Sequence, residues 1–372
     1  MHAHVANFFS WMGVGLPAFL FVITLVVFIH ELGHFVVARL CGVTVETFSI
    51  GFGREIIGFN DRKGTRWKLS WIPLGGYVKF LGDADASSRP DRKAMQAQDD
   101  AVQSAMLHFK PLYQRALVAA AGPFANFILA IVIFAAIILT YGKPAEPPIV
   151  ESVTPGSAAE MAGIKPGDTI RSVGGETILV FSDLQRVVGG NAGHRLHVVV
   201  TRGGRDVGVD VVPTLAEVTD AGGAKRSFGR LGIKDATVGV GVLEAVKGGV
   251  DQTWFVIAQT GSYLGRIVTG RESPDQLHGI LGIGAVSDQA ARIGFSALIS
   301  LAGLMSVSIG LVNLLPVPVL DGGHLLYYAC EAVLGRPLGE RAQEVGFRLG
   351  LAFVLCLMLL ATFNDLVRLN LF

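Results

Sequence analysis

Four apolar segments, each close to the ~20 residues that a helix needs to cross a bilayer, limit what this chain can fold into. Composition agrees with them, because 51% of the 372 residues are hydrophobic and 16% are charged, against about 25% charged in a typical soluble protein. We therefore predict a polytopic α-helical membrane protein with about four transmembrane helices and some soluble portion. The four segments are Gly15–Arg39, Leu117–Tyr141, Phe295–Leu315 and Val345–Phe363.

A fifth candidate, Thr253–Val268, is short and carries Gln259, Ser262 and Arg266. A juxtamembrane amphipathic helix explains these polar side chains better than a span does. The N-terminal tail has no lysine or arginine, so the first segment is expected to be a retained span rather than a cleaved signal peptide.

The placement of lysine and arginine predicts the orientation. Twelve of them lie between residues 39 and 116, and Arg336 and Arg341 lie between the last two segments. Both loops are therefore expected in the cytoplasm, and both termini and the long stretch 142–294 outside. The net charge of +1 gives no reason to expect a nucleic-acid partner.

The first segment ends in the pentapeptide His30-Glu31-Leu32-Gly33-His34. Residues i and i+4 share a helix face, so His30 and His34 can direct two imidazoles at one Zn²⁺, with Glu31 as general base for water. An ordinary polar helix face is the alternative. It is disfavoured here because charged groups within a span cost a few kcal/mol or more and are functional by default.

Asp321 is the predicted third zinc ligand. It follows Pro316 and Pro318, which break the end of the third segment, and it precedes two glycines that free the backbone to turn the carboxylate inward. The first and third segments run in the same direction, so Asp321 is expected at the depth of the two histidines, near the cytoplasmic face. A turn or capping aspartate is the alternative.

Three other residues near these motifs have competing interpretations. Asn313 can hydrogen-bond the substrate backbone or the site, and a helix–helix hydrogen bond is the alternative. His324 lies past the two glycines, which favours packing or support of the site over metal ligation. Cys41 is expected to be a small buried apolar residue, and the three cysteines are too scattered for a disulfide framework.

Two regions outside the spans have β patterns. Residues 48–53 and 68–80 alternate apolar and polar side chains, which predicts a membrane-associated β-hairpin or sheet covered by protein or water. Residues 142–215 predict an inserted α+β domain with a hairpin at Gly203-Gly204. Its element order, with Ala-Gly-Ile-Lys-Pro-Gly-Asp at 162–168, resembles a PDZ domain, a fold that binds extended peptides beside a strand and a helix. A domain without a ligand is the alternative.

These assignments divide the chain into a series of regions. They are the tail and first span (1–39), the cytoplasmic loop with the β-region (40–116), the second span (117–141), the PDZ-like domain (142–215), a linker with the amphipathic helix (216–294), the third span (295–315), the Asp321 motif with a cytoplasmic loop (316–344), and the fourth span with the C-terminal tail (345–372).

Taken together, the pentapeptide on a first span, Asn-Leu-Leu-Pro-Val-Pro-Val-Leu-Asp-Gly-Gly at 313–323 and the intervening PDZ-like domain resemble the site-2 protease family of intramembrane zinc metalloproteases. Within that family, the bacterial regulator of sigma-E protease type is the nearest match. Secondary matches are Gly-Phe-Gly at 51–53, Ile-Pro-Leu-Gly-Gly-Tyr-Val-Lys-Phe-Leu-Gly-Asp at 72–83 and Ala-Gly-Pro-Phe-Ala-Asn at 121–126.

The resemblance implies a role for each matching residue. His30, His34 and Asp321 would bind zinc, and Glu31 would be the catalytic base. Substrate would be held by the β-region and by the third span, with Gly51, Phe52, Gly53, Gly75, Gly76 and Asn313 as the contacting residues.

It also implies partners and a location. The substrates would be single-pass membrane proteins of the anti-sigma factor type and remnant signal peptides, and peptide C-termini would bind the PDZ-like domain. The protein would lie in the bacterial inner membrane, with both termini and the PDZ-like domain in the periplasm.

The chain departs from the family pattern at two places. Only one PDZ pattern is clear, whereas the best-known relative has two, and Ile280 and Ile283 stand in a segment where the family commonly has proline. Two other functions compete with proteolysis. A peptide-recruiting membrane scaffold leaves Glu31 and Asp321 at membrane depth without a purpose, and a metal-ion transporter would need more polar positions along its spans.

Overall fold

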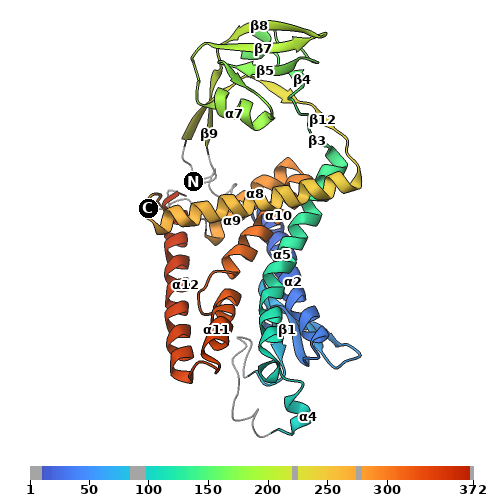
Figure 1. The fold of residues 1–372 in the computed structure, drawn as a ribbon, viewed down its shortest axis with the longest axis vertical. Coiled ribbons are helices and arrows are strands. Elements are labelled where there is room, and N and C mark those ends of the chain that lie inside the picture. Colours follow the sequence, from blue (N-terminus) through green and yellow to red (C-terminus); the bar gives the residue numbers. More distant parts are fainter. Residues whose placement is uncertain (1–10, 84–97, 220–224, 274–278, 369–372) are drawn as a thin grey trace. The chain divides into compact units, whose positions relative to one another are not determined.

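A computed structural model describes residues 11–83, 98–219, 225–273 and 279–368 (Figure 1). The chain divides into two compact units. The helical unit comprises Met1–Phe134 and Gly248–Val367, and the sheet unit centres on Ala135–Lys247.

Four helices in the described part of the chain are long and apolar enough to cross a membrane. They overlap the four predicted spans, and the third helix ends at Asn313, two residues before the predicted end. The overlap supports a polytopic membrane protein. The fifth candidate segment lies in α8 (Val242–Val268), which is not among the four. The four are α2 (Leu16–Leu40), α5 (Leu112–Tyr141), α10 (Phe295–Asn313) and α12 (Glu340–Arg368).

Shorter elements complete the helical unit. α9 packs against α2 and α10, and its first turn is tied to α12, because the Asp365 carboxylate accepts from Gly279 N at 3.1 Å and Gly282 N at 2.8 Å. The shorter elements are a π-helical turn (Trp11–Gly15), α4 (Asp100–Gln103), a 3₁₀ turn (Leu107–Phe109), α9 (Ile280–Ile293) and α11 (Asp321–Leu334).

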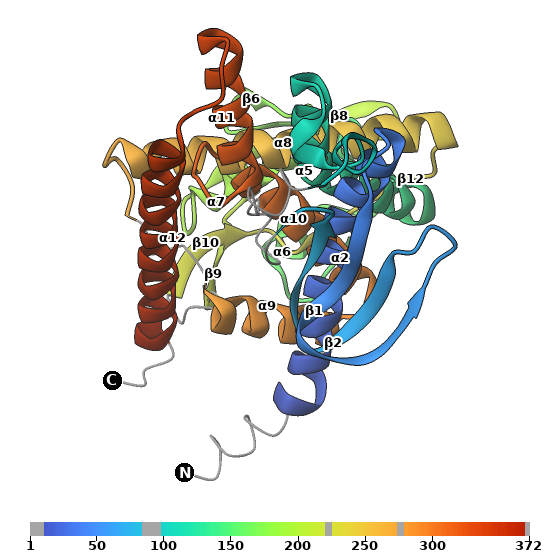
Figure 2. The same cartoon turned by 90° about the horizontal axis from the view of Figure 1, so that it is seen from below.

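The predicted β-region is a curled antiparallel sheet made by two long strands, β1 (Val45–Asn60) and β2 (Arg66–Phe80). Figure 2 shows both beside α2, which they contact. Ser49 pairs with Tyr77 on one side and with Lys68 on the other, while Gly58 also pairs with Lys68. The order across the sheet is therefore 76–80, 45–50, 66–70, 55–60, which leaves the stretch 76–80 at an edge.

The sheet unit is built around a four-stranded sheet in the order β6-β5-β7-β8. Its core is formed by aliphatic side chains of these strands and of α7, including Ile170, Val198 and Leu184. The predicted hairpin at Gly203 and Gly204 connects β7 and β8. The elements are β3 (Lys143–Pro144), β4 (Val150–Val153), α6 (Ala158–Met161), β5 (Thr169–Val173), β6 (Glu176–Thr177), α7 (Phe181–Gly189), β7 (Leu196–Arg202), β8 (Arg205–Val211), β9 (Thr214–Thr219), β10 (Lys225–Arg230), β11 (Ile233–Asp235) and β12 (Thr237–Val238).

The sheet unit extends beyond the predicted boundary at residue 215. β11 pairs with β4 and β12 pairs with β3, so residues 233–238 close the unit rather than link it to the next span. Leu231 is buried in the same core. The pairing partners lie about 80 to 95 residues earlier in the chain, which is why a local pattern did not reveal them.

Candidate metal centre

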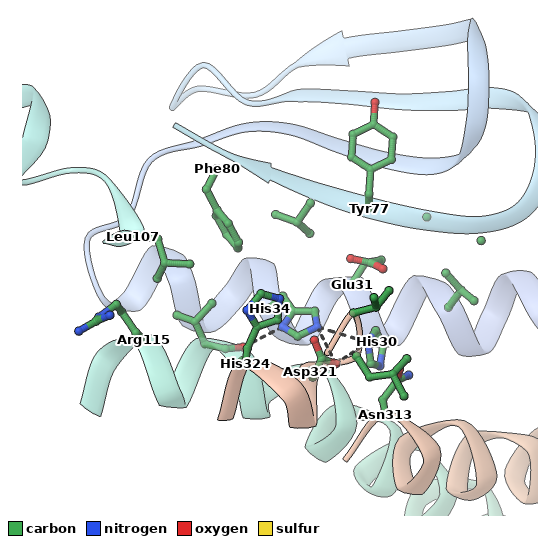
Figure 3. A pocket seen from close by; sticks show the side chains of 18 of the residues that line it. His30, Glu31, His34, Tyr77, Phe80, Leu107, Arg115, Asn313, Asp321 and His324 are labelled. Carbon is green, nitrogen blue, oxygen red and sulfur yellow. Dashed lines mark hydrogen bonds and ion pairs between the residues drawn. The ribbon is translucent and has the colours of Figure 1, made fainter. Parts of the chain in front are cut away.

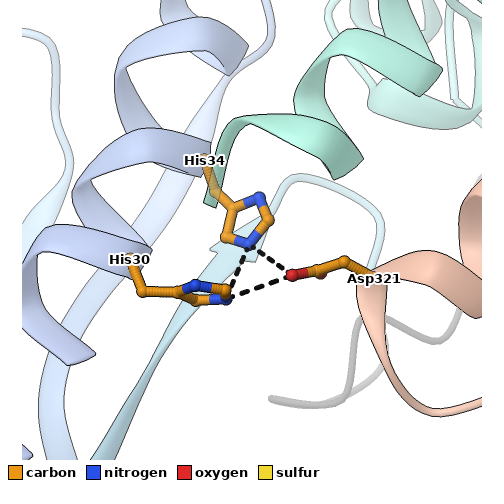
Figure 4. Close-up of side chains that lie close together, drawn as sticks. All are labelled: His30, His34 and Asp321. Carbon is orange, nitrogen blue, oxygen red and sulfur yellow. Dashed lines mark hydrogen bonds and ion pairs between the residues drawn. The ribbon is translucent and has the colours of Figure 1, made fainter. Parts of the chain in front are cut away.

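The two histidines of the pentapeptide lie one turn apart on α2 and face the same point (Figure 4). Their Nε2 atoms are 3.3 Å apart. Asp321, the first residue of α11, directs Oδ2 to 3.1 Å from His30 Nε2 and 3.4 Å from His34 Nε2. The structure therefore brings together the three residues predicted to bind zinc.

Close packing of the start of α11 against the segment that follows α10 positions Asp321 beside the two histidines. α10 ends at Asn313, and α11 starts after a short segment containing the two prolines. A Cβ at Gly322 would lie 2.3 Å from the carbonyl oxygens of Leu314 and Leu315, and one at Gly323 would lie 2.4 Å from Val317 O. The two glycines thus permit close packing of α11 on the preceding segment, and neither has a positive φ. Close approach, rather than the predicted flexibility, is the reason for glycine here.

Helix α5 holds both imidazoles from behind. His34 Nδ1 donates to Val118 O at 2.7 Å, and His30 Nδ1 lies 3.3 Å from the side-chain amide of Asn126. A Cβ at Gly122 would lie 2.3 Å from His34 Nε2 and 2.8 Å from His30 Cε1. Only glycine lets α5 come this close to the two rings.

The donor set fits a tetrahedral metal ion. A zinc ion with bonds of about 2.0–2.1 Å keeps its ligand atoms about 3.3–3.4 Å apart, close to the 3.1–3.4 Å found here. Because His34 Nδ1 donates to Val118, a neutral His34 presents a lone pair on Nε2. No described group other than the two imidazoles hydrogen-bonds Asp321 Oδ2. Three converging acceptors repel one another unless a cation lies between them.

The three residues lie in a cavity of about 360 Å³ that also contains Glu31 (Figure 3). Val78, on the 76–80 edge of the sheet, lines the same cavity. A Cβ at Gly76 would lie 3.1 Å from Glu31 Cγ. Glu31 is therefore held between its own helix and the sheet edge, beside the histidine pair.

The residues expected to contact substrate separate into two groups. Asn313, Gly75 and Gly76 line the cavity, as does His324. Gly51, Phe52 and Gly53 are not among its lining residues. The Phe52 ring stacks on Tyr77 at 6.0 Å and packs against Gly75, so this part of β1 supports the cavity wall from behind.

Sequence reasoning assigned no role to several residues at the other end of the cavity. His108 and Arg115 line it, and Arg115 forms a two-pronged ion pair with Glu331 of α11 at 3.0 and 2.5 Å. Burial raises the pKa of Tyr328, under the Arg115 guanidinium, to about 12. Gly122 and Asn126 were also given no role, although an asparagine inside an apolar span is itself a signal. His2, His4 and His278 lie outside the described residues.

Comparisons with known proteins all match this chain to metalloproteases. A model of peptidase family M50 matches residues 18–357. Relatives from Agrobacterium fabrum and Mesorhizobium japonicum, both named "putative zinc metalloprotease", are 49% identical over 355 residues and 45% identical over 364 residues. The alignments cover 94% of each chain in the first case, and 96% of this chain and 99% of the relative in the second. Metalloprotease MmpA of Caulobacter vibrioides is 42% identical over 385 residues, with 96% of each chain covered.

Proposed function

This chain belongs to peptidase family M50, and from that premise we propose that it is a zinc metalloprotease that cuts its substrates within their membrane-spanning segments. His30, His34 and Asp321 hold the zinc, and Glu31 is the catalytic base. The observation that carries the proposal is the convergence of the three donor atoms beside Glu31, at the end of a helix long and apolar enough to cross a bilayer.

The chemistry divides between the metal and Glu31. Zinc, when bound, makes water nucleophilic near neutral pH and polarises the scissile carbonyl. A Glu31 carboxylate oxygen accepts the proton of the attacking water and returns it to the leaving amine nitrogen. The close approach of Gly76 limits the movement of the Glu31 side chain and helps to position the carboxylate for this task. A positioned base is effective because its geometry is set before the reaction.

The sheet edge at 76–80 offers a place for substrate. A helical segment has its amides hydrogen-bonded internally and must become extended before its backbone can be cut. An extended substrate strand added to this edge would regain hydrogen bonds for its amides, next to Glu31. Asn313, in the opposite wall of the cavity, is suited to hydrogen-bond the same backbone.

Replacement of the base tests the mechanism directly. Glu31→Gln should retain one zinc per chain and lose at least about 10²–10⁴-fold in cleavage rate of a reconstituted single-pass substrate. Glu176→Gln, an exposed site in the sheet unit, is the matched control and should cleave normally. Full activity of Glu31→Gln would refute the mechanism, and a purified wild-type protein that binds no zinc would refute the whole proposal.

We further propose that the sheet unit is a PDZ domain that binds peptide C-termini. A groove of about 450 Å³ runs between α7 and the β10–β11 segment. Apolar side chains line it, and Gly232, with φ +81°, turns the backbone at one end. Such a groove suits an extended peptide with an apolar last residue.

A pair of substitutions on the β9–β10 hairpin distinguishes binding of peptide in the groove from nonspecific binding to exposed apolar side chains. Phe228 lines the groove and Leu215 does not, although both side chains are exposed. In the full-length protein, Phe228→Ala should weaken binding of fluorescent apolar C-terminal peptides by about 5–10-fold, as expected for one lost aromatic contact, and Leu215→Ala should not. Equal effects would contradict a binding groove.

The substrate class and the location follow from the resemblance and from the charge pattern. We propose substrates of the anti-sigma factor type, shortened first by another protease and screened by the PDZ domain, in regulated intramembrane proteolysis at the bacterial inner membrane. Both termini and the sheet unit are placed in the periplasm, with the zinc near the cytoplasmic face. Cysteines introduced singly at exposed Arg205 and exposed Arg336 test this orientation. A membrane-impermeant thiol reagent should label only the first in intact spheroplasts.

A further inference from the structure

A buried asparagine lies behind His30 and has an unpaired amide oxygen. Asn126 lies on α5, inside an apolar span, and is fully buried. Its Nδ2 is 3.3 Å from His30 Nδ1, and its Oδ1 has no hydrogen-bond partner among the described residues. A buried amide costs free energy unless its polar atoms are paired, so this side chain calls for an explanation.

The chemistry of His30 decides which end of the amide belongs opposite the ring. His30 Nε2 faces Asp321 Oδ2 and His34 Nε2, so Nε2 is the atom that would bind zinc, and a neutral ring then carries its proton on Nδ1. An N–H on Nδ1 needs an acceptor. The two ends of an asparagine amide have nearly the same shape and are assigned from their hydrogen bonds. A half-turn of the amide brings the unpaired Oδ1 to Nδ1 and removes a contact between two donors.

His34 shows the same arrangement with a backbone group. Its Nδ1 donates to Val118 O at 2.7 Å, also from α5. Val118 and Asn126 are two helical turns apart, and Gly122 lies between them against both rings. The backbone at Asn126 is itself fixed, because Ser306 Oγ of α10 donates to Asn126 O at 2.7 Å. One face of α5 thus supplies an acceptor for each imidazole.

We propose that Asn126 is the positioning residue of the zinc site: its amide oxygen accepts the Nδ1 proton of His30 and so fixes the tautomer and the angle at which Nε2 meets the metal. Groups that hold a metal-binding imidazole in this way typically change metal affinity about 10–100-fold when removed. The inference rests on the proposed zinc site and adds a residue that touches neither metal nor substrate.

Three variants of the full-length protein test it. Asn126→Leu keeps the volume and removes the acceptor, Asn126→Asp keeps an acceptor and removes the NH₂ group, and Ser308→Ala removes an exposed hydrogen bond within α10 that involves neither Asn126 nor His30. Zinc affinity is measured by competition with a chelator, and the absorption spectrum of the Co²⁺-substituted protein reports ligand geometry. We expect about 10–100-fold weaker zinc binding and an altered spectrum for Asn126→Leu, with Asn126→Asp and Ser308→Ala close to wild type.

The outcomes separate this inference from the proposed function. Unchanged zinc affinity and spectrum in a folded Asn126→Leu protein would overturn it, and so would an Asn126→Asp protein that loses as much affinity as Asn126→Leu. If Asn126→Leu fails to fold, Asn126→Ala, which also lacks an acceptor, provides the same contrast with Asn126→Asp. Absence of zinc binding in wild type and in Glu31→Gln alike would instead remove the proposed function.

Discussion

Asp168 in the sheet unit and Asp321 in the helical unit are both shielded carboxylates, with side chains 1% and 18% exposed, but their partners are opposite in kind. Asp168 is surrounded by donors. Arg202 donates to both of its oxygens at 2.7 and 2.6 Å, and Lys165 N donates at 2.8 Å. Asp321 Oδ2 faces two imidazole nitrogens, of which His34 Nε2 has no proton when the ring is neutral.

The difference separates a structural carboxylate from the proposed metal ligand. A carboxylate whose hydrogen bonds are complete stabilises the fold and has no capacity left for a ligand. A buried carboxylate that faces other acceptors lacks hydrogen-bond donors within the protein, and a bound cation supplies the missing positive charge. Removal of Asp321 should therefore impair function with little effect on the fold, and removal of Asp168 should do the reverse.

Substitution of Asp321 should have the largest effect. In Asp321→Asn the side-chain NH₂ can donate to an imidazole, so the fold is retained, but a neutral amide is a weak zinc ligand. We expect cleavage to fall at least about 10³-fold, because several kcal/mol of metal-ion catalysis is lost. Zinc content should fall in parallel, with the melting temperature of the zinc-free protein unchanged. Asp168→Asn is the control. Retention of zinc by Asp321→Asn would contradict the proposal that Asp321 is a zinc ligand.

A methyl group at Gly122 should have the next largest effect. The added Cβ would lie within 2.3–2.8 Å of both imidazoles, so the rings must move, and displacements of about 1 Å at a reacting centre cost about 10²-fold in rate. Overpacking should also destabilise the fold by about 1–3 kcal/mol. Cleavage assays and zinc titration of Gly122→Ala measure the effect. Gly261→Ala, where a Cβ meets nothing within 4 Å, is the matched control, and equal behaviour of the two variants would contradict the tight fit.

A feature of this molecule could be predicted from the sequence when it depends on residues that are close together along the chain. His30 and His34 are related by helix periodicity, which is local, and Asp321 follows a proline-broken span whose depth the charge pattern indicated. Asn126, Gly122 and Val118 act on histidines more than eighty residues away through α2–α5 packing, which no local pattern contains. The length of the apolar runs predicted the four spans, and this too is a local property. The pairing of β11 with β4 is a long-range contact, and it places the end of the sheet unit beyond the predicted boundary.

Loss of the Asp168 carboxylate should have a smaller effect, confined to stability. Asp168→Asn weakens its hydrogen bonds with Arg202 and Lys165, and hydrogen bonds to charged groups contribute about 1.5–3 kcal/mol. Hydrogen exchange of the buried β5 and β7 amides, followed in the full-length protein, should show local opening easier by about that amount. Cleavage of a substrate too short to reach the sheet unit should be unchanged. Unaltered exchange would mean that Asp168 is not the structural carboxylate that its contacts indicate.

The smallest effect is a pH dependence of the same amides. Burial opposes ionisation of Asp168, but the Arg202 guanidinium and the Lys165 N–H together hold the pKa of the Asp168 carboxyl below its usual range. A carboxyl whose folded pKa lies below its unfolded value, about 3.9, stabilises fully above that value. This contribution to stability is lost as the pH falls toward the folded pKa, because the unfolded state takes up the proton first.

The opening free energy of β5 and β7, corrected for the intrinsic exchange rate, should therefore be constant near neutral pH and fall below about pH 4. Asp168→Asn lacks the carboxyl and should show a shallower fall, whereas Asp206→Asn, at an exposed carboxylate on β8, should follow wild type. Parallel curves for wild type and Asp168→Asn would show that other carboxylates dominate the acid sensitivity of the sheet unit.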